Sequence, residues 1–140
     1  MAFSAYLADK VLVWVKGTAF PSALTNVYVS LHSADPGTAG TTSDVTASIK
    51  GSATRTAIAA ADFSSVGAAS GGGFEITNSN VVQFTTNAAN GSTITVTHFG
   101  LWDASTGGNF LASGSLSASV DVATGDTVQF NAAALAVRVV

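Results

Sequence analysis

The segment at residues 97–111, Thr-His-Phe-Gly-Leu-Trp-Asp-Ala-Ser-Thr-Gly-Gly-Asn-Phe-Leu, constrains the fold of this chain more than any other. Its first part alternates in polarity and ends in Trp102, a Gly-Gly-Asn turn follows, and a second apolar stretch begins at Phe110. Glycine and asparagine tolerate the positive φ angles that tight turns require. The segment therefore predicts an antiparallel β-hairpin.

Short apolar segments separated by turn residues recur along the rest of the chain. Asn-Gly and Thr-Gly-Asp provide further turns. Many short strands at near-regular spacing favour an all-β fold, either an antiparallel β-sandwich or a jelly-roll-like barrel. Strands are predicted at residues 27–31, 54–59, 74–77, 81–85, 93–102, 110–116, 127–130 and 135–139.

Residues 5–16 depart from this pattern and predict a short N-terminal α-helix. Ser4 is a suitable N-cap and Gly17 a suitable stop signal. Helical spacing produces an apolar stripe that consists of Leu7, Val11 and Trp14. Such a stripe is more typical of core packing than of a partner-binding face, so we expect Trp14 to be largely buried.

The length of 140 residues predicts one β-sandwich domain over residues 1–140, with an N-terminal helical segment at 1–20. Residues 39–52 and 64–73 are rich in Thr, Ser, Gly and Ala and poor in large apolar side chains. We expect them to be flexible loops that the core does not hold, and to contact neighbouring subunits or the surface of a larger particle.

Charged residues make up only 9% of the chain, and the net charge is −3. Since a weakly charged surface has little electrostatic protection against association, we expect a homo-oligomer. Five scattered cations form no basic stripe, which argues against direct binding of nucleic acid. The apolar run at residues 11–15 is too short to span a membrane, and the absence of cysteine excludes disulfides.

The potential catalytic residues are few. His32 and His98 lie in or beside apolar runs, which is typical of structural histidines; regular alternation would place His98 with Val96 on one face and Phe99 on the other. Glu75 is the single glutamate, and the chain has no Gly-x-Ser-x-Gly motif and no P-loop lysine. The turn at 103–109 lacks the glutamate of a calcium loop. We expect no enzyme activity, no cofactor and no metal.

Four residues remain as a candidate interaction surface. Tyr6 and Tyr28 are the aromatic residues least expected to face the core. Lys50 and Arg55 are the cations nearest the predicted loop at 39–52, where they could meet acidic partners.

The order of several motifs resembles that of small tailed-bacteriophage virion structural proteins. The motifs cover nearly the whole chain and lie at residues 3–15, 27–31, 34–37, 97–103, 106–109, 125–130 and 133–135. Residues 52–55 depart from the pattern, because Ser-Ala-Thr-Arg stands where such chains often carry Gly-Gly-x-Tyr-Ala-Arg.

The resemblance implies a virion protein, assembled in the host cytoplasm, and suggests a capsid decoration or cement protein. Such a protein, expected as a trimer, would bind the major capsid protein or other virion proteins and stabilise the capsid exterior. The alternative is a tail, baseplate or fibre-associated protein involved in host attachment, and a more remote one is a carbohydrate-binding module.

Overall fold

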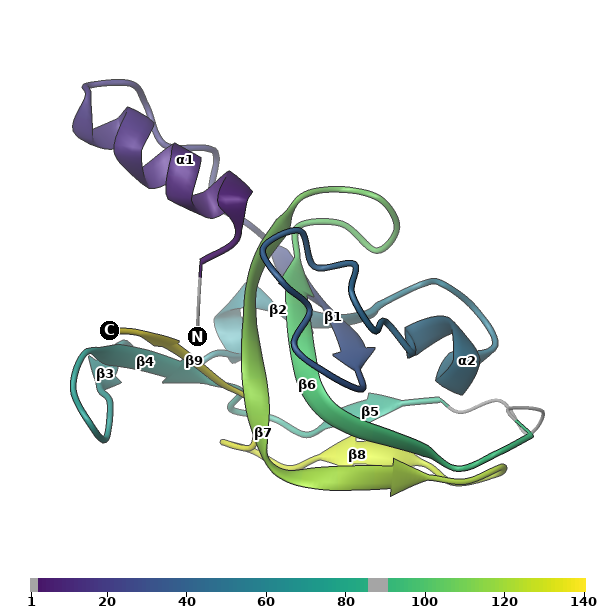
Figure 1. The fold of residues 1–140 in the computed structure, drawn as a ribbon. Helices are drawn as coiled ribbons and strands as arrows, with labels where there is room; N and C mark the ends of the chain where they lie inside the picture. The colour runs from purple at the N-terminus through teal and green to yellow at the C-terminus, as the bar shows by residue number, and fades with distance from the viewer. Residues whose placement is uncertain (1–2, 86–90) are drawn as a thin grey trace.

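The computed structural model describes residues 3–85 and 91–140, and antiparallel strands dominate it (Figure 1). The predicted all-β, sandwich-like fold with a short N-terminal helix is confirmed. The elements in chain order are α1 (Ala5–Val15), β1 (Asn26–His32), α2 (Thr46–Lys50), β2 (Thr56–Ala59), the 3₁₀ helix η1 (Ala60–Asp62), β3 (Gly67–Ala68), β4 (Phe74–Thr77), β5 (Val82–Phe84), β6 (Ile94–Trp102), β7 (Phe110–Val122), β8 (Val128–Phe130) and β9 (Ala136–Val139).

The strands form three antiparallel sheets. Their orders are β2-β1-β6-β7, β3-β4-β9 and β5-β8. The four-stranded sheet and the β5-β8 pair turn their apolar side chains toward a common core, where the rings of Phe84 and Phe130 meet edge-on at 5.9 Å between centroids. The core therefore lies between two sheets, as the strand pattern predicts.

Each predicted strand corresponds to an observed one, with boundaries that differ by a few residues. The largest difference is in β7, which continues six residues beyond the predicted end at residue 116. The strand β3 lies within the segment predicted as a loop at 64–73. Asn90, of the predicted Asn-Gly turn, lies outside the described residues.

The predicted hairpin at 97–111 is confirmed as the β6–β7 turn. The Asp103 carboxylate accepts hydrogen bonds from the Asn109 backbone N–H at 2.6 Å and from its side-chain amide at 2.7 Å. This carboxylate and the positive φ angles of Gly107 and Gly108 account for the turn.

The prediction that His98 and Val96 share one face of β6 is wrong. Val96 and Phe99 are both fully buried in the same core, although three positions separate them. The register of β6 on β7 shifts between Val96 and His98, and this irregularity interrupts the alternation. His98 instead lies opposite His32 of β1.

The expectation that the core does not hold residues 39–52 is also wrong, because α2 lies inside this segment. Ile49 is fully buried in the core, and the Thr46 hydroxyl accepts a hydrogen bond from the Leu31 backbone N–H at 2.9 Å. Backbone hydrogen bonds from Ser33 to Ser43 at 3.0 Å and from Val45 to Leu31 at 2.9 Å attach the segment to β1 as well. The flexibility of this segment stays a prediction.

Candidate interaction surface

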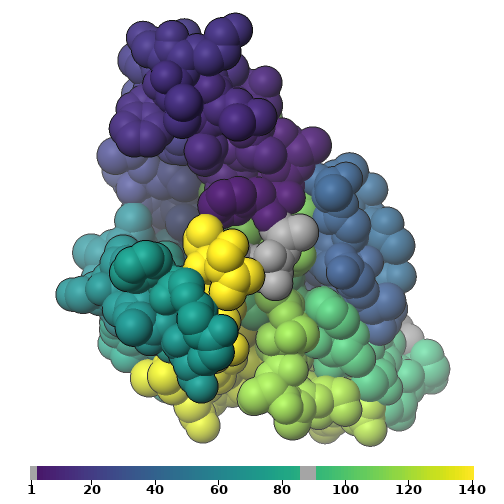
Figure 2. Space-filling model, turned by 60° about the vertical axis from the view of Figure 1, so that its left-hand side comes forward, coloured from purple at the N-terminus to yellow at the C-terminus, as the bar shows by residue number. Residues whose placement is uncertain are grey.

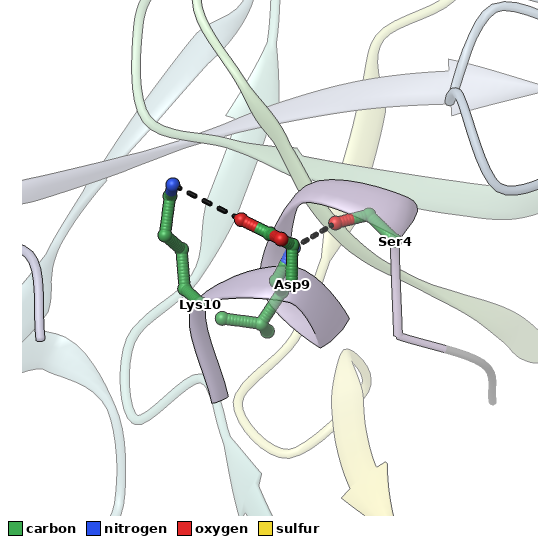
Figure 3. A network of polar contacts seen from close by, with 4 residues as sticks. Ser4, Asp9 and Lys10 are labelled. Atoms are coloured by element: carbon green, nitrogen blue, oxygen red, sulfur yellow. Dashed lines mark hydrogen bonds and ion pairs between the residues drawn. The ribbon is translucent and has the colours of Figure 1, made fainter. Parts of the chain in front are cut away.

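In the described residues, the backbone hydrogen bonds that join the helix α1 to β7 and to the 35–40 turn lie at its N-terminal end. The backbone N–H of Ser4 donates to the carbonyl of Leu111 in β7 at 3.1 Å, and that of Ala5 donates to the carbonyl of Thr38 at 3.2 Å. The predicted N-cap is confirmed, since the Ser4 hydroxyl accepts from the Leu7 N–H at 3.0 Å (Figure 3). From this anchor the helix extends away from the sheets (Figure 1).

The expectation that Trp14 is buried is wrong. No residue of α1 is buried, and the exposed fractions reach 66% for Leu12, 58% for Trp14 and 71% for Val15. Five consecutive apolar residues, Val11–Val15, surround the helix on every side, because each step turns by about 100°. The rest of the chain covers one side of this helix at most, so the C-terminal half of α1 is left largely exposed.

The chain returns from α1 to β1 through an extended segment at residues 18–25. This segment and the helix border a cleft of about 380 Å³, whose walls include Tyr6, Leu7 and Leu111. Phe20 and Leu24 of the returning segment are themselves exposed. We call residues 5–24 the helix arm.

A second apolar patch lies on the three-stranded sheet β3-β4-β9, which we call the β-arm. Phe74 of β4 is 62% exposed and lies directly opposite Val139 of β9, which is also exposed. Val66 and Val140 add further exposed apolar side chains at the ends of these strands. The patch belongs to a sheet rather than to a flexible tail, so its shape is set by strand pairing.

The helix arm and the β-arm lie on the same side of the molecule. In Figure 2 the purple helix arm lies above the teal β3–β4 strands, with the yellow C-terminal residues between them. A cavity of about 140 Å³ lies at the end of β9 and is lined by Phe3, Arg138, Val139 and Val140. The two apolar patches therefore lie on one side of the molecule, with the C-terminal residues between them.

The two predicted cations bind their own chain. The Arg55 guanidinium lies 3.6 Å from the centroid of the Trp102 ring and donates to the carbonyls of Ala104 at 2.9 Å and Gly107 at 2.8 Å. Lys50 Nζ donates to the Thr54 carbonyl and the Thr56 hydroxyl. Burial lowers the pKa of both side chains. Arg55 thus acts as a clamp on the β6–β7 turn.

The two predicted tyrosines lie apart from each other. Tyr6 is on the helix arm, where Lys10 Nζ lies 5.3 Å from the centroid of its ring. Tyr28 is in the middle of β1, opposite Trp102 of β6, and is half-buried. The structure therefore does not gather the four predicted residues into one surface, and only Tyr6 belongs to the exposed apolar side.

A serine, a histidine and a tryptophan form a buried network on the other face of β1 and β6. The His32 Nδ1–H donates to the Thr42 carbonyl at 2.9 Å, so the Ser30 hydroxyl must donate to His32 Nε2 at 2.7 Å. The Trp102 indole N–H donates to Ser30 Oγ at 2.9 Å. Burial lowers the pKa of His32, which favours this neutral tautomer.

This network has the atoms of a nucleophile and a base without access for a substrate. Ser30 and His32 are both fully buried, and every polar atom of the network has a partner within the chain. Among residues 3–85 and 91–140, no group of three or more His, Cys, Asp or Glu side chains could hold a metal ion. The arrangement is suited to holding β1 against β6 and the 38–45 segment.

Sequence reasoning missed the exposed helix arm because it counted only the stripe of Leu7, Val11 and Trp14. The run at residues 11–15 was the available signal: a helix that is apolar on all sides needs neighbours on all sides.

Comparison with known proteins identifies a family to which most of this chain matches. A family model described as "Podophage GP4 fiber I protein gp80" matches residues 2–138, which includes the helix arm, the four-stranded sheet, the β5-β8 pair and all of the β-arm except its last two residues. A search of curated proteins found no match. Within the described residues, no helix is both long enough and apolar enough to cross a membrane.

Proposed function

Since this chain belongs to the podophage GP4 fiber I protein gp80 family, we propose that it is a structural component of a tail fibre. Family membership makes it a bacteriophage structural protein and a part of the virion. The single observation that carries the proposal is the match over residues 2–138, because it covers the described domain rather than one short module.

The family description favours the fibre over the capsid exterior as the place of action. The motifs that suggested capsid decoration are turn and core residues, such as the Asp103–Asn109 contact and the strand β1. Residues of this kind specify the fold and not the binding partner. They are therefore equally compatible with either position in the virion.

In this proposal the protein acts by binding other virion proteins and not by catalysis. The exposed side chains of the helix arm and the β-arm supply an apolar contact area. The buried Ser30–His32 pair and the ion-paired Glu75, whose carboxylate lies 2.6 Å from Arg138 Nε, offer no reactive group to a substrate. Assembly is the function that these surfaces favour.

Labelled electron microscopy of intact virions tests the location. Gold-conjugated Fab fragments raised against the purified protein are bound to virions and imaged, with Fab fragments against the major capsid protein as the control. We expect gold at the tail and its fibres. Gold distributed over the capsid shell, as in the control, would contradict the fibre assignment and support the decoration hypothesis instead.

A further inference from the structure

We propose that the side formed by the helix arm and the β-arm is a self-association surface, and that its occupant is a second copy of this chain. The proposal does not depend on the fibre assignment, because it concerns the purified protein. It rests on the amount of exposed apolar surface, on its distribution around α1 and on the charges next to it.

The exposed apolar area of the two arms is comparable to that of a stable protein–protein interface. The exposed fractions of Leu12, Trp14, Val15, Phe20 and Leu24 correspond to roughly 600 Å² of accessible surface of these apolar residues on the helix arm, and the β-arm adds roughly 500 Å². A stable interface buries about 800 Å² on each partner. The apolar side of one chain is therefore large enough to sustain a stable complex with an equal surface.

The apolar side chains at the end of α1 are distributed around the whole helix. The five apolar residues at positions 11–15 point to all sides of the helix, and the rest of the chain covers only part of this circumference. A flat partner would cover one further side only. Helix arms from two or more copies, packed side by side, can cover the remaining sides, as in a helix bundle.

The charged side chains on this side of the molecule are mostly paired within the chain. The ion pairs on this side are formed within the chain, between Lys10 and Asp9 at 3.1 Å and between Arg138 and Glu75 at 2.6 Å (Figure 3 shows the first). In the described part of the helix arm, Lys16 is the one charged side chain without an ion pair. A surface that is neutralised in this way meets an identical surface with little like-charge repulsion and offers little to a strongly charged partner.

The mass of the purified full chain in solution tests the proposal. We expect light scattering at micromolar concentration to give a mass at least twice that of the 13.9 kDa chain, with the stoichiometry read directly from the ratio. The double variant Leu12→Glu, Val15→Glu should weaken association at least about 30-fold, because these side chains would become buried charges in the complex. The variant Trp14→Ser should act in the same direction.

These substitutions spare the fold of the single chain, since all three side chains are mostly exposed in it. Val81→Glu is the matched control, because Val81 is 53% exposed and lies outside both arms. Circular dichroism and thermal unfolding of each variant verify that the β-sandwich is intact. The control should keep the wild-type mass.

Tryptophan fluorescence locates the interface independently. Trp102 is buried in the single chain, whereas Trp14 is exposed, so dilution through the dissociation range should shift the emission to longer wavelength through Trp14 alone. The shift should be absent in Trp14→Phe. A concentration-dependent mass without this shift would place the interface elsewhere and overturn the proposal.

Three further results would overturn it in whole or in part. A wild-type chain that stays at 13.9 kDa, including one that binds a different virion protein through the helix arm, contradicts self-association. A Leu12→Glu, Val15→Glu variant that associates like wild type contradicts the role of the helix arm. A Phe74→Glu variant that associates like wild type removes the β-arm from the interface.

Discussion

Replacement of Asn78 by alanine should be among the most damaging single changes in this fold. Asn78 follows β4 and is only 1% exposed. Its side-chain amide donates to the carbonyls of Asn80 at 2.8 Å and Asn131 at 2.9 Å, and its oxygen accepts from the buried backbone N–H of Leu135 at 2.9 Å. One side chain thereby joins the end of β4 to the connection between β8 and β9.

The cost follows from these three contacts. Each hydrogen bond contributes about 1 kcal/mol net, so their loss should lower the free energy of unfolding by about 3 kcal/mol. The value rises toward about 5 kcal/mol if no water reaches the Leu135 N–H, because a buried donor without a partner bears its full desolvation penalty. Asn78→Asp retains the shape and the acceptor but loses both donors and buries a charge, so it should cost at least as much.

Urea unfolding followed by fluorescence and circular dichroism measures the effect, at one protein concentration for all variants because association shifts the apparent stability. Asn80→Ala is the matched control: Asn80 is exposed and its amide makes one contact, to Asp62 at 2.9 Å. The control should cost less than about 1 kcal/mol. An Asn78→Ala protein as stable as the control would refute the idea that this residue holds the two segments together.

Three other substitutions test the remaining features. Burial lowers the pKa of His32 in the folded state, so the unfolded chain takes up a proton first as the pH falls below about 6.5, and the stability present above that pH is progressively lost. Urea midpoints between pH 7.5 and 5 should show this loss, which His32→Gln should remove. Arg55→Lys should lower the free energy of unfolding by about 1–2 kcal/mol, because lysine cannot stack on the indole and donate to both turn carbonyls; equal stability would refute the clamp. Gly40→Ala should cost more than Gly125→Ala in thermal unfolding, since both have positive φ but only a β-carbon at position 40 would clash with the Phe110 ring; equal costs would contradict this packing.

Most of the strands could be predicted because their signals are local. Alternation over four to nine residues identified β1, β2, β4 and β6, since side chains in a strand point to opposite faces at every step. The same holds for the cap at Ser4 and for the turn closed by Asp103, where the bonding partners lie three and six residues away. Contacts between residues so close in the sequence can be predicted from the local sequence alone.

The candidate site was predicted only in part. Tyr6 was correctly singled out as an aromatic residue outside the core, but Arg55 was interpreted as a free cation. Its ring partner is 47 positions away and its carbonyl partners are 49 and 52 positions away, which no local pattern can encode. Similarly, the buried role of Asn78 depends on partners up to 57 positions away.

The sequence alone therefore determined the class of fold and the positions of most of its strands and of α1, because hydrophobic periodicity and turn-forming residues act over a few residues. Only the tertiary structure decided which apolar side chains the core reaches. Ile49 lies in a polar segment yet is fully buried, whereas Trp14 lies in an apolar helix yet is exposed. The physical reason is that burial depends on which distant segments the sheets bring within contact, and in this chain they bring α2 inward and leave the end of α1 uncovered.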